Sequence, residues 1–259
     1  MYKKIRFPGI RTIMRHLKQL SCALILIGIV PTGMFAQTEN YQAVHGTFTD
    51  PRDHRTYKTV QIGNQTWMAE NLAYLPAVNP PSMGSDTIPY FYVYNYHGTC
   101  DSTARLTHNY QTYGVLYNWP AAVISCPPGW HVPSDHEWTI LVNYLIDHGY
   151  NYDGRTSGNK VAKSLATASG WAESSNQGAV GNDDYPSFQN KSGFSALPAG
   201  YRHDSNTFRS EGRFCAWWSN SDLRPTLDWC RTLNFYGAEL YRGGINKNAG
   251  FSVRCIKDD

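Results

Sequence analysis

Residues 217–248 have the chemistry of a ligand-binding surface. Aromatic rings, side-chain amides and a guanidinium group occur together there; aromatic planes stack on sugar or peptide faces, while Asn and Arg direct hydrogen bonds. The predicted ligand-binding residues are Trp218, Asn234, Tyr236, Tyr241, Arg242, Asn246 and Asn248. Gly243-Gly244 is predicted to turn the chain sharply within this surface. The alternative is that tryptophans of this stretch, such as Trp217 and Trp229, belong to the core.

Side chains that could catalyse a reaction are scattered. His131 lies near Glu137, but Ser134 and Glu137 form the S-x-x-E pattern that caps a helix, so we expect a structural role for this group. Ser195 lies in the sequence GFSAL, which lacks the G-x-S-x-G elbow of serine hydrolases. We therefore expect no enzymatic activity.

Cation-binding residues are also sparse. The nine histidines show no metal-ligand spacing. Calcium prefers carboxylate and amide oxygens, so its candidate ligands are Asn220, Asp222, Asp183 and Asp184. Because an acidic pair in a loop is usually solvated, we expect no cofactor, with calcium at these residues as the alternative.

Residues 1–36 have the features of a secretory signal peptide. All charges there are positive, an apolar run extends from Leu20 to Val30, and Ala36 precedes a polar stretch. The run is about half of the roughly 20 residues that a membrane-spanning helix needs. We predict cleavage after Ala36 and export to the periplasm, the outer surface or the medium, with no transmembrane segment left. Translation from Met14, an uncleaved anchor and a lipoprotein attached through Cys22 are the alternatives.

Removal of this segment reverses the net charge of the chain. The sequence has 23 Lys and Arg against 20 Asp and Glu. The basic residues lost with the segment are Lys3, Lys4, Arg6, Arg11, Arg15 and Lys18, which leaves 17 basic residues and a net charge of −3. No basic stripe then indicates binding to nucleic acid or anionic lipid.

Local patterns predict a hairpin and a helix. Residues 56–62 and 65–68 are strand-like and flank Gly63-Asn64, which is a two-residue hairpin connection. A capped helix begins after Ser134 and ends at His148-Gly149. Its buried face consists of Trp138, Leu141, Val142 and Leu145.

The other predicted elements are short, and together they indicate an α+β fold. Residues 37–47 form a polar N-terminal arm, a second helix covers 159–168, and 169–200 is a long loop. Strands are predicted at 90–96, 214–218, 229–235, 239–242 and 251–256. We expect short helices packed on twisted antiparallel strands with long loops.

Five sequence blocks resemble a known family. They are 63–72 (GNQTWMAENL), 113–119 (YGVLYNW), 126–138 (CPPGWHVPSDHEW), 193–202 (GFSALPAGYR) and 250–255 (GFSVRC). In this order they resemble the Fibrobacter succinogenes major paralogous domain, over residues 48–257. Membership of that family implies no biochemical activity.

A more distant resemblance bears on the fold. Residues 131–138 and the closing GFSVRC are similar to segments of the sulfatase-modifying, formylglycine-generating superfamily, which implies a C-type-lectin-like fold. The enzymes of that superfamily hold copper with two closely spaced cysteines on a late strand. The matching stretch here contains only Cys230, and one thiol does not supply a two-thiolate site.

Five cysteines follow the signal segment, and an oxidising compartment favours their pairing. We predict a Cys126–Cys255 bond, because the first residue precedes the capped helix and the second ends the domain. We also predict Cys215–Cys230, since these residues flank a short connection between two strands. Cys100, in a polar loop, is left unpaired. No C-x-x-C spacing indicates a zinc or thioredoxin-type site.

Three classes of function fit these observations. The first, which we predict, is a non-catalytic binding module at the cell surface that recognises a glycan or a surface protein. The second is a structural surface or pilus-associated subunit, which an arm donating a strand to a neighbour would favour. A diverged formylglycine-generating-type enzyme is the third.

Overall fold

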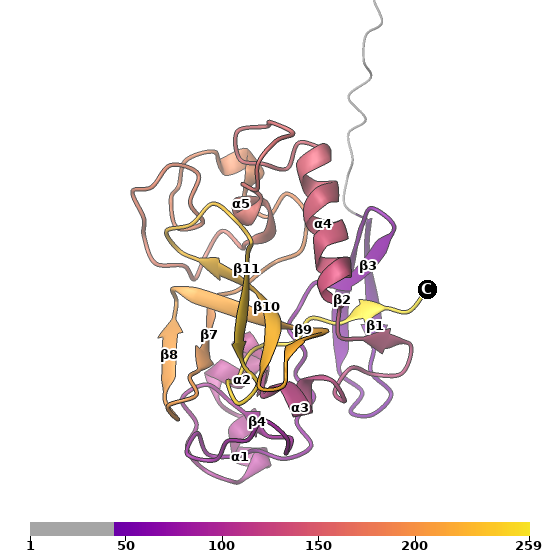
Figure 1. Ribbon diagram of the computed structural model, residues 1–259, viewed down its shortest axis with the longest axis vertical. Coiled ribbons are helices and arrows are strands. Elements are labelled where there is room, and N and C mark those ends of the chain that lie inside the picture. Colours follow the sequence, from indigo (N-terminus) through magenta and orange to yellow (C-terminus); the bar gives the residue numbers. More distant parts are fainter. Residues whose placement is uncertain (1–43) are drawn as a thin grey trace, which may run out of the picture. The chain divides into compact units, whose positions relative to one another are not determined.

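Two five-stranded sheets flank a central helix in the computed structural model, which describes residues 44–259 (Figure 1). The first sheet has the order β1-β2-β3-β12-β6, with β1 Val44–Thr49, β2 Thr56–Ile62, β3 Gln65–Met68, β12 Ile256–Lys257 and β6 Trp130–His131. The second has the order β11-β10-β9-β7-β8, with β7 Ala199–Arg202, β8 Phe208–Glu211, β9 Phe214–Arg224, β10 Leu227–Asn234 and β11 Tyr241–Asn246. Strands β4 (Phe91–Tyr92) and β5 (Leu116–Tyr117) pair separately.

The helices are short apart from the central one, α4 (Asp135–Asp147). The others are α1 Asp101–Arg105, α2 His108–Tyr113, α3 Trp119–Ala122, α5 Ala162–Leu165 and the 3-10 turn η1 Pro186–Phe188. No helix in the described part is long and apolar enough to cross a membrane. All described residues belong to one compact unit, and its mixed content confirms the α+β class.

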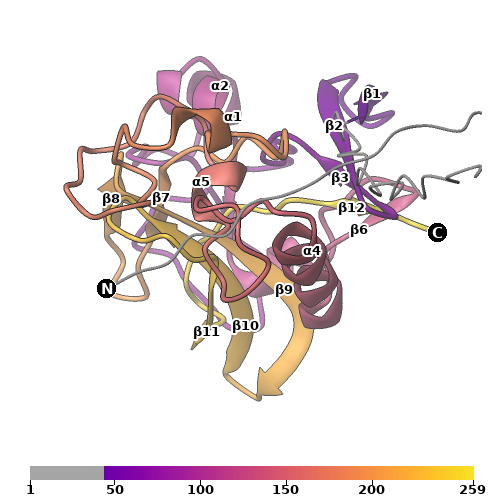
Figure 2. The same ribbon diagram turned by 90° about the horizontal axis from the view of Figure 1, so that it is seen from above.

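The capped helix is confirmed as α4. The Ser134 hydroxyl accepts the backbone N–H of Glu137 at 3.2 Å, and the Glu137 carboxylate accepts the backbone N–H of Ser134 at 2.7 Å. This capping box satisfies two otherwise unpaired donors. Trp138, Leu141 and Leu145 are buried as predicted, between β2 on one side and β9 and β10 on the other. Figure 2, viewed from above, shows α4 between the two sheets.

The predicted hairpin is confirmed as β2 and β3. Ile62 pairs with Gln65, so the connection is Gly63-Asn64, and Gly63 has φ of +61°. A left-handed residue at this position suits glycine, which carries no Cβ. Strand β12 pairs with the far side of β3, so the last strand of the domain lies inside the first sheet.

Strands β9 and β10 are buried on both faces. Trp217 lies in one apolar cluster with α4 and Phe194, whereas the next residue, Trp218, lies in a second cluster with Phe251. Successive side chains of a strand point to opposite faces, so this pair marks the two sides of the sheet. The core therefore has two parts, separated by the second sheet.

The structure confirms one predicted disulfide and contradicts the other. Cys126 and Cys255 are bonded, with Cα atoms 5.9 Å apart, and Cys100 is free and exposed. Cys215 and Cys230 are also free and buried. Cys215 pairs with Leu233 and Cys230 with Trp218 across the strands, so the two thiols face different clusters. Thiols on opposite faces of a sheet can neither form a disulfide nor share a metal ion.

Several predicted boundaries need correction. Residues 44–47, assigned to the arm, belong to β1, which pairs with β2; the predicted signal peptide and residues 37–43 lie outside the described residues. The second helix shrinks to α5, because Ala166 turns to an extended conformation and bridges Ala196. Of the strands predicted at 90–96 and 251–256, only residues 91–92 and 256 are in strands, although Phe251 and Ser252 form isolated bridges.

Candidate functional site

The predicted ligand residues of β10 and β11 fall on two different faces of this hairpin. Thr232 pairs with Tyr241 and Arg231 pairs with Arg242, so Tyr241 and Arg242 point in opposite directions. The face with Arg231 and Arg242 lies against the first turn of α4. The face with Thr232 and Tyr241 is covered by the core at Cys230 but is open at the end that carries Tyr241, which is 55% exposed.

Arg242 is held by α4 and is not part of the open face. Its guanidinium donates to both carboxylate oxygens of Asp135, at 2.9 and 2.8 Å, and lies 3.4 Å from the ring centroid of Trp229. Arg231 donates to the same carboxylate at 2.6 Å. Burial opposes ionisation of Asp135, but the hydrogen bonds from Arg242 and Arg231 outweigh it and lower the pKa of this carboxyl. This cluster joins the hairpin to α4.

The open face contains a hollow of about 270 Å³, which we call the aromatic hollow. It is lined by Thr232, Asn234, Tyr236, Gly237, Glu239 and Tyr241. Tyr236 and Tyr241 are 53% and 55% exposed. Three predicted ligand residues, Asn234, Tyr236 and Tyr241, are therefore brought together. Thr232 and Glu239 were missed, although Thr232 alternates with Asn234 along β10 and Glu239 stands two residues before Tyr241.

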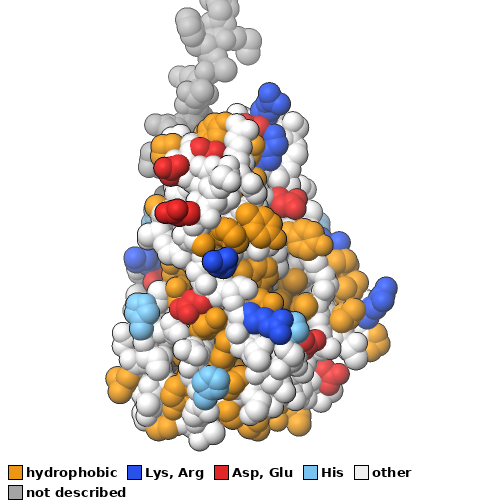
Figure 3. Space-filling model, turned by 90° about the vertical axis from the view of Figure 1, so that its left-hand side faces the viewer, with side chains coloured by type: hydrophobic (Ala, Val, Ile, Leu, Met, Phe, Trp, Pro, Cys, Tyr) orange, Lys and Arg blue, Asp and Glu red, His pale blue; other side chains and the backbone are white. Residues whose placement is uncertain are grey.

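Exposed apolar side chains alone do not define a site on this protein. Figure 3, which views the left-hand side of Figure 1, shows hydrophobic side chains gathered across the middle of that face with scattered charges between them. Partly exposed aromatic pairs also occur elsewhere, such as Tyr152–Tyr185 and Tyr94–Phe208, with ring centroids 5.0 and 5.1 Å apart. The aromatic hollow differs because its rings flank a concave surface with an amide and a carboxylate.

Three other predicted ligand residues are structural. Trp218 is fully buried, packs on Phe251 and donates its indole N–H to the Tyr117 carbonyl at 2.7 Å, so its assignment to the ligand face was wrong. The Asn246 side chain accepts the backbone N–H of Asn248 at 2.9 Å, which shapes the turn after β11. The carbonyl of Asn248 accepts from buried Arg202 at 2.6 Å.

The candidate calcium ligands do not converge. No group of three or more His, Cys, Asp or Glu side chains that could hold a metal ion occurs within residues 44–259. Asp184 pairs with Lys163 at 2.9 Å, and Asp222 pairs with Lys247 at 3.1 Å. Asp183 is exposed beside Asp184, while Asn220 lies in β9 with Asp222. The four oxygen-bearing residues are thus divided between a loop and a strand, and two of them are paired with lysines.

The buried carboxyl next to Asp222 gives a prediction of pH dependence. Asp228 is fully buried, its Oδ2 accepts no hydrogen bond from any described residue, and the Lys247 ammonium is 3.8 Å away. Burial raises the pKa of Asp228 to about 7. An unfolded Asp titrates near 4, so between about pH 4 and 7 the folded state keeps a proton that the unfolded state has lost. Stability from this group is therefore lost as the pH rises through that window.

We expect Asp228→Asn to raise the free energy of unfolding above about pH 7, by on the order of 1–2 kcal/mol, because an amide needs no proton to stay neutral. Urea unfolding of both proteins at about pH 5 and pH 8 measures the difference. Asp86→Asn, at an exposed position, is the control. A variant no more stable than the parent at the higher pH would contradict the prediction.

The His131 cluster is structural, as expected. One ring nitrogen lies 2.8 Å from Glu137 and the other 2.6 Å from Asp258, so both are occupied. Burial opposes protonation, but the hydrogen bonds to Asp258 and Glu137 raise the pKa of His131. The Ser195 hydroxyl contacts Asn190 and Gly193, with no histidine among its partners. Neither serine nor histidine is arranged as a nucleophile with its base.

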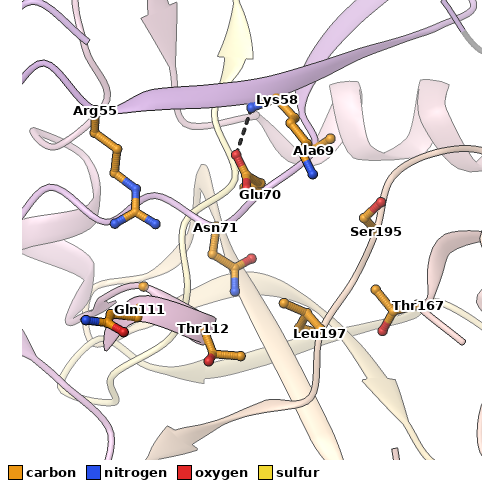
Figure 4. A pocket seen from close by; sticks show the side chains of 11 residues that line it. Arg55, Lys58, Ala69, Glu70, Asn71, Gln111, Thr112, Thr167, Ser195 and Leu197 are labelled. Atoms are coloured by element: carbon orange, nitrogen blue, oxygen red, sulfur yellow. Dashed lines mark hydrogen bonds between the residues drawn. The ribbon is translucent and has the colours of Figure 1, made fainter. Parts of the chain in front are cut away.

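A second cavity was not predicted from the sequence. This polar pocket has a volume of about 270 Å³ and lies between β2, α2 and the loop before β7 (Figure 4). It is lined by Arg55, Lys58, Ala69, Glu70, Asn71, Gln111, Thr112, Gly114, Thr167, Ser195 and Leu197. Figures 1 and 2 place α2 and β2 on the opposite side of the domain from β10 and β11. The two cavities are therefore separate.

Comparison with known proteins identifies the family. The model of the Fibrobacter succinogenes major domain matches residues 60–257. The chain belongs to this family. No curated protein and no solved structure matches the chain.

Sequence blocks of the Fibrobacter succinogenes major domain meet at the polar pocket. Glu70 and Asn71 come from the first block, Gly114 from the second, and Ser195 and Leu197 from the fourth. This convergence is the signal that could have revealed the pocket, because residues far apart in sequence form one surface. The blocks also contribute residues to the core, so their spacing alone does not distinguish residues that line the pocket from residues that pack in the core.

Arg254, which comes from the fifth sequence block, bonds two residues that line the pocket. The Asn71 amide oxygen accepts from the Trp217 indole and from the Arg254 guanidinium, both at 3.0 Å. Arg254 also donates to the carbonyls of Phe194 and Ser195. Burial lowers the pKa of Arg254 to about 9. This buried network positions the Glu70-Asn71 turn and the Ser195 loop, which are two walls of the pocket.

Proposed function

We propose that this protein is an exported, non-catalytic binding module that recognises a glycan through the aromatic hollow. The observation that carries the proposal is the pair of half-exposed rings, Tyr236 and Tyr241, flanking a concave surface that also presents Asn234 and Glu239. Aromatic planes bind the apolar faces of sugar rings, an amide both donates hydrogen bonds to hydroxyls and accepts them, and a carboxylate accepts them. A ligand of this kind needs no catalytic group.

We also infer a C-type-lectin-like architecture and export by a signal peptide. The resemblance of residues 131–138 and 250–255 to the formylglycine-generating superfamily supports the architecture, as does the disulfide that joins Cys126, before the capped helix, to Cys255 at the domain end. The basic N-terminus and the apolar run before Ala36 support export. Display of many copies on a surface would then compensate for weak single sites by avidity.

The test is to screen the purified protein on a glycan array and then titrate a bound glycan into variants. Tyr236→Ala and Tyr241→Ala should each lower the affinity about five- to tenfold, because each removes one stacking surface. Asn234→Ala should have a smaller effect, through one hydrogen bond. Micromolar to millimolar dissociation constants are expected for a single site.

The matched control is Leu106→Ala, which truncates a side chain that is 77% exposed and lies after α1, away from the hollow. It should leave glycan affinity unchanged. Circular dichroism of each variant establishes that the fold is intact. If folded Tyr236→Ala and Tyr241→Ala variants bind the glycan as tightly as the parent, the ligand site lies elsewhere.

A further inference from the structure

Several polar side chains that line the polar pocket have no hydrogen-bond or ion-pair partner among the described residues. Among the described residues, the Arg55 guanidinium makes no ion pair and no hydrogen bond, and it lies 5.6 and 5.7 Å from the ring centroids of Tyr57 and Tyr110. The Gln111 amide and the Lys58 ammonium likewise have no hydrogen-bond partner within residues 44–259. Polar groups of a folded protein that face a cavity without partners are available to a ligand.

Glu70 adds a fixed acceptor to this set. One carboxylate oxygen accepts the backbone N–H of Lys58 at 2.7 Å, which Figure 4 shows as a dashed line. The second oxygen accepts no hydrogen bond from a described residue. The bond to the backbone orients the carboxylate, so its second oxygen can accept from a ligand hydroxyl without losing that anchor.

The remaining polar groups of the pocket are already bonded within the fold. The Thr167 hydroxyl donates to the Ala196 carbonyl at 3.0 Å, and the Ser195 hydroxyl donates to the Gly193 carbonyl at 3.2 Å. Their oxygen lone pairs can still accept. In Figure 4, Arg55 and Gln111 lie at one end of the pocket and Ser195 and Thr167 at the other. Unused donors are thus concentrated at the Arg55 end.

The charge around the pocket favours an anion. Arg55 and Lys58 line it, and buried Arg254 lies beneath it, bonded to Asn71 and Ser195. Glu70 is the one carboxylate in the lining. No aromatic ring lines the pocket, so recognition there depends on charge and hydrogen bonds rather than on stacking.

We propose that the polar pocket is a second binding site, specific for a carboxylated sugar such as a uronic acid. Arg55 pairs with the sugar carboxylate, and Lys58 adds to the positive field. The free oxygen of Glu70 and the Gln111 amide bond the neighbouring hydroxyls. The site is independent of the aromatic hollow and lies on the other side of the domain, so failure of one proposal leaves the other intact.

The test is isothermal titration of the purified protein with glucuronate, glucose and acetate. Glucuronate should bind with a millimolar dissociation constant. Glucose and acetate should each bind at least tenfold more weakly, because glucose lacks the carboxylate and acetate lacks the hydroxyls. Added salt should weaken glucuronate binding. Equal binding of glucose would overturn the role of charge, and equal binding of acetate would overturn the role of the hydroxyls.

Variants then locate the site. Arg55→Gln should weaken glucuronate binding at least tenfold, Arg55→Lys should weaken it less, and Gln111→Ala should weaken it a few fold. Arg224→Gln, an exposed arginine in β9 outside the lining, is the control and should bind as the parent does. Tyr241→Ala should also leave glucuronate binding unchanged, which separates this site from the aromatic hollow. Absence of glucuronate binding by the parent, or full affinity in a folded Arg55→Gln variant, would overturn the proposal.

Discussion

Replacing Cys126 and Cys255 together with serine should lower the free energy of unfolding by about 4–5 kcal/mol. The bond closes a segment with a sequence separation of 129 residues. A cross-link of this length removes a large part of the conformational freedom of the unfolded chain. Because domains of this size are stable by only about 5–15 kcal/mol, this loss is a large part of the total stability.

Urea unfolding of the parent and the double variant measures this loss, and addition of reductant to the parent should reproduce it. Cys100→Ser is the matched control, since Cys100 is exposed and free. It should change stability by no more than about 0.5 kcal/mol. A loss below about 1 kcal/mol in the double variant would show that the bond does not constrain the unfolded chain as argued.

Arg254→Ala should cost about 3–5 kcal/mol of folding free energy. The side chain is 1% exposed, its guanidinium bonds Asn71 at 3.0 Å, and it lies 4.3 Å from the ring centroid of Phe194. Truncation leaves a cavity and removes the donors of several buried oxygens at once. Arg254→Met refills much of the volume and should therefore recover part of the loss.

Chemical denaturation of both Arg254 variants, with Arg224→Ala as an exposed control, gives the comparison. The control should lie within about 0.5 kcal/mol of the parent. If Arg254→Ala lost no more stability than the control, the buried network would not stabilise the walls of the polar pocket.

The features predicted correctly from the sequence depend on neighbouring residues. The capping box of Ser134 and Glu137 and the Gly63-Asn64 turn are complete within a few positions, so their local chemistry determines the element. The helices α1, α2 and α3 have four to six residues each and show no full hydrophobic period. Such short helices depend on tertiary contacts, and the pattern of the sequence did not predict them.

The errors at the predicted site have a common cause in the second sheet. Pairing of β10 with β9 shifts register near Asp228, and both faces of these strands are buried. An alternating pattern normally distinguishes a buried face from an exposed one, but here Trp217 and Trp218 are both buried. The face of Trp218 and the separation of Cys215 from Cys230 therefore could not be deduced. The polar pocket was missed because its walls come from segments up to 142 positions apart, such as Arg55 and Leu197.

The place of β12 in the first sheet has a consequence for biogenesis. Ile256 pairs with Trp67 of β3 on one side and with His131 of β6 on the other, so this strand joins the beginning of the domain to its middle. Until residues 255–257 have emerged, β6 lacks β12, its neighbour in the sheet, and Cys126 lacks its native partner Cys255. If the chain is exported as proposed, we therefore expect this domain to fold after translocation rather than during it.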